Sequence, residues 1–178
     1  MSGPVLVLVG PPASGKTTVG TAVAEILGVP FRDTDADVET VAGVTVADLF
    51  VQYGEPYFRD LEEQAVARAV ADHEGVLALG GGAVTSAATR DLLVGHGRSG
   101  GRVVWLDVDV ASAAKRIGLS RDRPLLAVNP RAMLRSMLED RAPLYGEVAT
   151  VTVPTAGREP GEVIAEVSAL VQAPGDVP

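Results

Sequence analysis

The sequence of 178 residues contains no cysteine, which excludes a disulfide-stabilised fold and is compatible with a reducing compartment. Long hydrophobic segments are missing as well. The apolar run at residues 5–9 ends at Gly10, far short of the roughly 20 residues that cross a membrane as a helix. No basic segment precedes this run, so a signal peptide is not indicated. We therefore expect a cytoplasmic protein without membrane association.

Aromatic residues are scarce at 4%, and only two of the 15 basic residues are lysines. The net charge of −8 disfavours binding to nucleic acid, and few aromatic side chains are present to stack on bases. In contrast, 47% of the residues are hydrophobic, enough to bury a sizeable core and to exclude disorder as the dominant state. No unpartnered apolar surface is evident in the pattern, so we expect a monomer.

Short apolar runs alternate with helical stretches, which favours an α/β fold with a parallel sheet. The pattern predicts one domain over residues 1–172 and a frayed tail over 173–178. Four glycines in 95–102 predict a flexible surface turn, and 118–128 is expected to be irregular. Strands are predicted at 5–9, 29–32, 76–79, 103–106 and 150–153. Helices are predicted at 16–27, 36–42, 46–53, 56–72, 86–94, 111–117, 131–144 and 161–171.

The motif G-x-x-x-x-G-K-T occupies residues 10–17, between an apolar strand and an amphipathic helix. In such a loop the backbone N–H groups and the helix N-terminus surround a phosphate. Lys16 is placed to reach the β- and γ-phosphates, and the Thr17 hydroxyl to bind Mg²⁺. The motif therefore predicts a nucleoside triphosphate site.

Asp33 and Asp35 follow the second predicted strand, at the sheet edge where ligands bind in parallel sheets. One carboxylate could hold metal-bound water and the other could orient an acceptor hydroxyl, although Asp35 could instead cap the following helix. Asp107 also ends an apolar strand, so Asp33 and Asp107 compete for the role near the metal. Spacing alone leaves that choice open.

Three glycines at 80–82 follow another strand and permit close approach of a small ligand, or form only a tight turn. Arg59 and Arg141 carry planar guanidinium groups that suit a carboxylate or a phosphate. The segment with Arg116, Arg121 and Arg123 could close over the phosphates, or could be an ordinary polar connection.

Together these motifs resemble the shikimate kinase family over nearly the whole chain. The most specific segments are D-T-D at 33–35, F-R-D-L-E-E at 58–63, G-G-G-A-V at 80–84 and R-A-P-L-Y at 141–145. The resemblance implies a nucleoside-monophosphate-kinase-like fold with a five-stranded parallel sheet flanked by helices. It also implies transfer of the ATP γ-phosphoryl group to the 3-hydroxyl of shikimate, within aromatic amino acid biosynthesis.

The resemblance further implies a role for each matching residue. Shikimate would be bound by residues from region 33–62 and beyond, namely Asp35, Arg59, Gly80, Gly81, Gly82 and Arg141. ATP would be bound by Pro12, Ala13, Ser14, Gly15, Lys16, Thr17, Thr18, Arg116, Arg123 and Arg158. Lys16, Asp35 and the lid residue Arg123 would be catalytic, with the lid at about 116–126. Mg²⁺ would be held by Thr17 and, through water, by Asp33.

One departure from the family pattern concerns the phosphate loop, where Ala13 replaces the usual glycine and disfavours a positive φ. Rival functions were another small-molecule kinase, such as a gluconate kinase, or a nucleotide-dependent switch. A GTPase switch is disfavoured because the sequence has no N-K-x-D motif, its single Asn129 being followed by proline. A catalytically silent binding module is disfavoured by the intact Lys16 and the paired aspartates.

Overall fold

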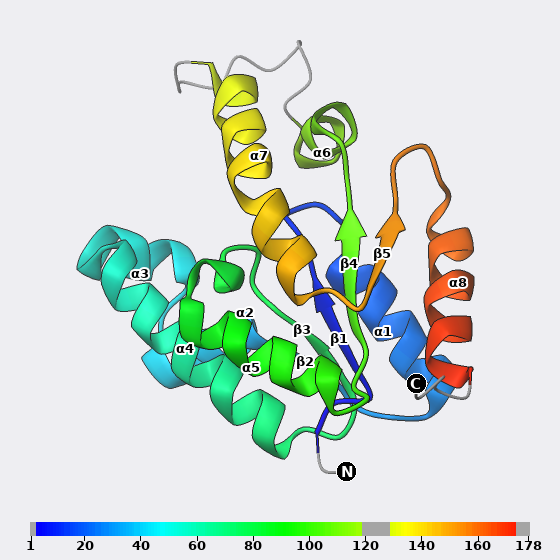
Figure 1. The fold of residues 1–178 in the computed structure, drawn as a ribbon. Helices are drawn as coiled ribbons and strands as arrows, with labels where there is room; N and C mark the ends of the chain where they lie inside the picture. The colour runs from blue at the N-terminus through cyan, green and yellow to red at the C-terminus, as the bar shows by residue number, and fades with distance from the viewer. Residues whose placement is uncertain (1–2, 119–128, 174–178) are drawn as a thin grey trace.

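The computed structural model describes residues 3–118 and 129–173. Its centre is a parallel sheet with the strand order β2-β3-β1-β4-β5 (Figure 1). The strands are β1 (Leu6–Val9), β2 (Phe31–Asp33), β3 (Val76–Ala78), β4 (Val103–Asp107) and β5 (Val151–Pro154). The predicted α/β class and the five-stranded parallel sheet are therefore confirmed.

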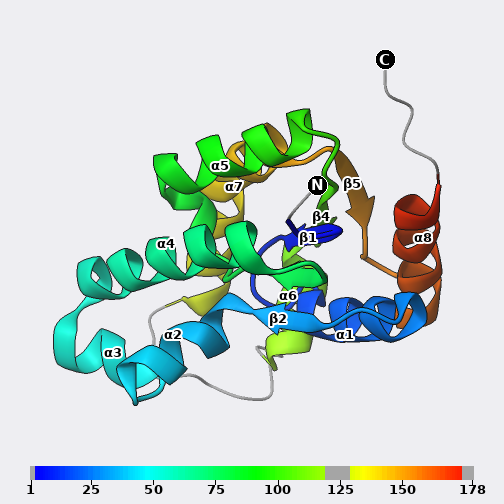
Figure 2. The ribbon, with the colours of Figure 1, turned by 90° about the horizontal axis from the view of Figure 1, so that it is seen from below.

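Helices cover both faces of this sheet (Figures 1 and 2). They are α1 (Lys16–Leu27), α2 (Thr34–Ala42), α3 (Val46–Tyr53), α4 (Glu55–Asp72), α5 (Ala87–Arg98), α6 (Val110–Ile117), α7 (Pro130–Val148) and α8 (Pro160–Gln172), with a 3₁₀ turn at Ala83–Thr85. None of the helices in the described ranges is both long and apolar enough to cross a membrane.

The central strand β1 explains why its sequence is apolar at every position. Side chains of a strand alternate between the two faces of a sheet. Val7 and Val9 belong to the core formed with α4, α5 and α7, whereas Leu6 and Leu8 belong to the core formed with α1 and α8. All four side chains are almost fully buried. Burial on both faces thus requires a continuous apolar run.

Two expectations about local structure were wrong. Helix α5 continues to Arg98, so Gly95 and Gly97 lie in its last turns and not in a flexible loop. Helix α7 includes Pro143, as the predicted helix 131–144 did, but ends only at Val148. In both cases the helix continues because its apolar side chains pack in the core, where Leu93 and Val148 are buried.

Parallel pairing brings the carboxyl ends of β1, β2 and β3 to one edge of the sheet. The phosphate loop leaves β1 there, the Asp33–Asp35 segment leaves β2, and the glycines 80–82 leave β3. Three segments that are far apart in the sequence therefore meet at this edge.

Ala13 adopts the left-handed backbone conformation, with φ 63°. Among the described non-glycine residues, only Asn129 shares a positive φ. This conformation costs an alanine roughly 1–2 kcal/mol, since its Cβ approaches the following carbonyl oxygen. The strain expected from the sequence departure at this position is therefore present in the phosphate loop.

We expect Ala13→Gly to stabilise the protein by about 1 kcal/mol, which raises Tm by roughly 2–4 °C in a chain of this size. Calorimetric melting of the nucleotide-free protein measures the shift. Ala67→Gly, at an exposed position inside α4, is the matched control and should lower Tm, because glycine disfavours a helix interior. A lower Tm in Ala13→Gly would contradict the assignment of strain.

Candidate active site

The phosphate loop joins β1 to α1 and leaves the first N–H groups of α1 without a side-chain cap. Gly15 occupies the N-cap position with φ 96°, and no acidic residue lies in the first turn. Gly10 has φ 150°, and a Cβ there would collide with the carbonyl of Leu106. Uncapped N–H groups and the positive end of the helix dipole suit this loop to an anion.

Lys16 lies inside the curve of the loop. Its Nζ donates to the carbonyl oxygens of Gly10 at 2.8 Å and Pro11 at 2.9 Å. Burial lowers the pKa of Lys16 to about 8, against the opposing effect of the negative charges of Asp35 and Asp33. The positive charge of Arg141 also lowers it. Charged residues from the segment after β2 and from α7 therefore act electrostatically on Lys16.

A cavity of about 320 Å³ opens beside the loop. It is lined by Ser14, Gly15, Thr18, Val19, Arg116, Thr155, Arg158, Pro160 and Val163. Arg116 closes one side of the cavity by donating to the carbonyls of Ala13 at 2.9 Å and Thr155 at 3.0 Å. The two arginines expected near adenine thus line one cavity that adjoins the phosphate loop.

The two aspartates after β2 have different surroundings. Asp33, not Asp35, is the N-cap of α2, since its Oδ1 accepts the Asp35 N–H at 2.9 Å. The capping alternative considered for Asp35 is therefore wrong, because the helix already begins at Thr34. The other oxygen of Asp33 accepts from the Thr17 hydroxyl at 3.4 Å.

The Asp35 carboxylate does not cap α2 and lies in different surroundings. Burial raises the pKa of its carboxyl, and the charge of Asp33 acts in the same direction. Lys16 and Arg59 oppose this rise through their positive charges. A Cβ at Gly80 would collide with the Asp35 carboxylate, so only glycine permits this approach. The result is a partly buried carboxylate, between a lysine and an arginine, with increased affinity for a proton.

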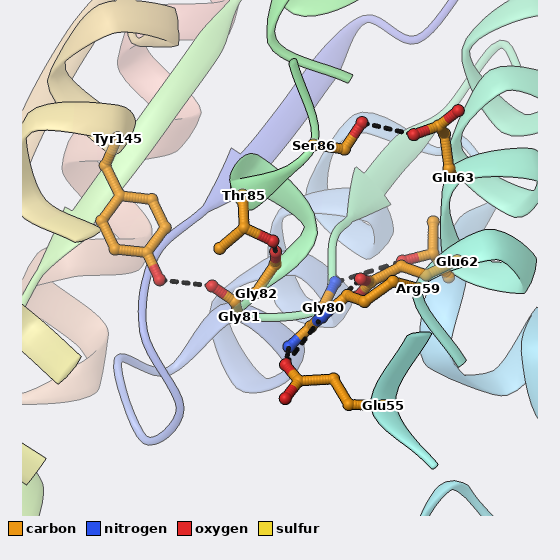
Figure 3. Close-up of polar contacts among 11 residues, drawn as sticks. Glu55, Arg59, Glu62, Glu63, Gly80, Gly81, Gly82, Thr85, Ser86 and Tyr145 are labelled. Atoms are coloured by element: carbon orange, nitrogen blue, oxygen red, sulfur yellow. Dashed lines mark hydrogen bonds and ion pairs between the residues drawn. The ribbon is translucent and has the colours of Figure 1, made fainter. Parts of the chain in front are cut away.

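Arg59 is held by two carboxylates of its own helix (Figure 3). Its guanidinium donates to Glu62 at 2.5 Å and to Glu55 at 3.2 Å. Glu62 is 2% exposed, and its second oxygen has no hydrogen-bond partner among the described residues. Burial raises the pKa of Glu62, which the hydrogen bond from Arg59 opposes. The motif at 58–63 assigns Glu62 no role, although the spacing of three residues on a helix predicts contact with Arg59.

The three glycines form a turn that other elements hold in place (Figure 3). Thr34, which is fully buried, accepts the Gly80 N–H at 3.1 Å. Tyr145 donates its hydroxyl hydrogen to the Gly81 carbonyl at 2.5 Å. A Cβ at Gly82 would collide with the Arg59 guanidinium, so the turn and that arginine are in close contact. Tyr145, like Glu62, received no role from its motif.

Arg141 lies on α7, one turn before Tyr145, and its charge affects the pKa values of Lys16, Glu62 and Tyr145. Arg59 and Arg141 thus belong to the electrostatic surroundings of Asp35 and Lys16. Asp107 ends β4, on the other side of β1 from Asp33. Arg121, Arg123 and most of the expected lid lie outside the described residues.

Comparisons with known proteins give the family and the fold. The family model described as shikimate kinase matches residues 12–172. The shikimate kinase of Salinispora arenicola is 56% identical over 170 residues, covering 96% of this chain and 99% of that protein. That of Frankia casuarinae is 59% identical over 159 residues, covering 89% of this chain and 68% of that protein.

Among solved structures, shikimate kinase from Acinetobacter baumannii in complex with shikimate has a TM-score of 0.83 and 37% identity, covering 96% of this chain and 93% of that one. A gluconokinase from Sinorhizobium meliloti, representing the rival small-molecule kinase, reaches a TM-score of 0.55 with 26% identity, covering 93% and 90%. With a family model that matches most of its length and relatives of more than 50% identity, this chain belongs to the shikimate kinase family.

Proposed function

We propose that the protein transfers the γ-phosphoryl group of ATP to the 3-hydroxyl of shikimate, giving shikimate 3-phosphate and ADP. The observation that carries this proposal is the meeting, at one sheet edge, of the loop that holds Lys16, the Asp35 carboxylate against Gly80, and the Arg59 guanidinium against Gly82. It supports two neighbouring anion sites, one for a triphosphate and one for a small hydroxy acid. We propose further that the protein acts in the cytoplasm as a monomer and binds neither nucleic acid nor membrane.

At the phosphate end, Lys16 would exchange the carbonyls of Gly10 and Pro11 for β- and γ-phosphate oxygens. The loop residues Pro12 to Thr18 would surround the phosphates, and Arg116 and Arg158 would flank adenine in the adjoining cavity. Arg123 would approach the γ-phosphate from the lid. Transfer would be direct and in line, because phosphoryl transfer depends on positioning and charge neutralisation more than on a covalent intermediate.

At the acceptor end, Asp35 would orient the 3-hydroxyl and accept its proton. The raised pKa of Asp35 suits it to this role, because a carboxylate with greater proton affinity is a better general base. Arg59 and Arg141 would hold the carboxylate of shikimate, and the glycines at 80–82 would allow its ring to approach. Two guanidinium groups around one small site favour an acidic acceptor over a neutral polyol.

A Mg²⁺ site also fits the residues present. Hydroxyl and carboxylate oxygens are the ligands that Mg²⁺ prefers, and the Thr17 hydroxyl lies beside the Asp33 carboxylate. Thr17 would bind the ion directly and Asp33 through water. When bound, Mg²⁺ would neutralise charge on the β- and γ-phosphates.

The central experiment is incubation with ATP, Mg²⁺ and shikimate, with the product identified by mass. We expect one phosphoryl group added to shikimate and stoichiometric ADP. Gluconate, a hydroxy acid of another shape, serves as the comparison acceptor. Slow hydrolysis of ATP without acceptor dependence would overturn the proposal.

We expect Arg59→Ala and Arg141→Ala each to raise KM for shikimate by about 10- to 100-fold, since each removes a charge-assisted hydrogen bond worth about 1.5–3 kcal/mol. KM for ATP should change little. The matched controls are Arg68→Ala on α4 and Arg135→Ala on α7, both exposed. Because Arg59→Ala leaves buried Glu62 unpaired, folding is checked by circular dichroism. An unchanged KM for shikimate in both folded variants would refute the clamp.

Nucleotide binding should take up protons near pH 8. Lys16 has a pKa of about 8 in the free protein, and phosphates raise it on binding, because they favour the charged form. At pH 8 we expect uptake of about half a proton by Lys16, falling toward zero at pH 6.5. Titration calorimetry in buffers of different ionisation enthalpy measures it, with Lys115→Ala as control. Equal uptake at both pH values would argue against Lys16 as the titrating group.

Asp33→Asn should raise the Mg²⁺ concentration for half-maximal rate about 10-fold, as expected when a water-bridged partner is lost. Asparagine is chosen because it retains the helix cap of α2 while removing the charge. Asp107→Asn is the matched control and should leave the Mg²⁺ requirement unchanged. The reverse result would assign the metal role to Asp107.

A further inference from the structure

Each carbonyl of the glycine turn at 80–82 has a partner, but one partner comes from far away in the sequence. The carbonyls of Gly80 and Gly82 accept the N–H groups of Ala83 and Thr85, which follow directly in the chain. The carbonyl of Gly81 accepts the hydroxyl of Tyr145, 64 residues away on α7. The orientation of this one peptide unit therefore depends on a tertiary contact.

The peptide that contains the Gly81 carbonyl also contains the Gly82 N–H. A trans peptide is planar, so its N–H points opposite to its carbonyl. With the carbonyl directed at Tyr145, the Gly82 N–H is directed away from Tyr145. The Arg59 guanidinium lies against Gly82 on the side of the turn opposite to Tyr145 (Figure 3). Rotation of this peptide would reverse the arrangement and aim a carbonyl oxygen toward a bound anion.

Glycine resists such rotation poorly, because it lacks the Cβ that restricts other residues. Tyr145 itself is held firmly. It is 1% exposed, and its ring packs against Trp105 with centroids 5.7 Å apart. Burial raises the pKa of Tyr145 to about 12, so the hydroxyl keeps its proton at any ordinary pH. A fixed, permanently protonated donor thus contacts a peptide unit that lies between two glycines.

We propose that Tyr145 is a positioning residue for the acceptor: its hydroxyl fixes the Gly81–Gly82 peptide with the amide hydrogen facing the carboxylate site of Arg59 and Arg141. Arg141 lies one turn earlier on α7. The same helix therefore supplies the Arg141 guanidinium and, through Tyr145, orients the Gly82 N–H toward the same carboxylate. This inference rests on the proposed function for the identity of that anion.

The test is Tyr145→Phe, which retains the buried ring and removes only the hydroxyl. Without the hydroxyl, the peptide is free to rotate, and the Gly82 N–H loses its hydrogen bond to the shikimate carboxylate. KM for shikimate should therefore rise about tenfold, as expected for loss of a hydrogen bond to a charged group. KM for ATP and kcat should change less than about threefold. The amide ¹⁵N resonance of Gly82 should also shift in the ligand-free protein, since its peptide loses the bond at the carbonyl. Tyr53→Phe, at an exposed tyrosine, should change none of these quantities.

A merely structural role would lower Tm or the active fraction without changing KM for shikimate selectively. An unchanged KM for shikimate, or a fall in kcat with KM constant, would overturn the proposal. An unshifted Gly82 resonance would do so independently of any activity. Failure of the wild-type protein to phosphorylate shikimate would instead overturn the proposed function, while the resonance would still report whether Tyr145 orients the peptide.

Discussion

The arrangement of charge around Lys16 depends on the parallel pairing of β1, β2 and β3. This pairing delivers a lysine, two aspartates and a glycine turn to one edge, where each would be unfavourable to bury alone. The mutual effects on their pKa values follow from that proximity: burial lowers the proton affinity of Lys16 and raises that of Asp35, and their opposite charges counter both shifts. Each of these two buried charges thus lowers the free-energy cost of burying the opposite charge beside it.

Much of the fold was predictable because the signals are local and repeated. The continuous apolar run at residues 5–9 predicts the strand observed as β1. The predicted helix 16–27 has the bounds observed for α1. Ser86, the first residue of the predicted helix 86–94, is the N-cap of α5 and accepts the Thr89 N–H. The errors arose where long-range packing decides. Gly95 disfavours helix locally, and the predicted helix 131–144 stopped before Val148, yet α5 and α7 continue because their apolar faces pack on the sheet.

The candidate site shows the same division. Motif spacing pointed to the phosphate loop and the aspartates, because each lies directly after a strand, and the family resemblance pointed to the two arginines. Spacing did not reveal that Asp33 rather than Asp35 caps α2, since the exact start of a helix depends on backbone geometry. Nor did it assign Glu62 or Tyr145, whose hydrogen bonds are visible only once α4, α7 and the glycine turn are placed together.

Lys16 hydrogen-bonds to two carbonyls of its own loop, and this has a consequence for nucleotide exchange. The Lys16 ammonium group already donates hydrogen bonds to two carbonyls in the ligand-free protein. A phosphate that binds Lys16 would therefore have to replace these carbonyls as hydrogen-bond acceptors. On the proposed function, phosphate oxygens would replace both carbonyls, and the carbonyls would accept the ammonium group again when the phosphates leave. The return of Lys16 to these carbonyls would offset part of the free energy lost when the phosphates depart, and would so favour release of the spent nucleotide.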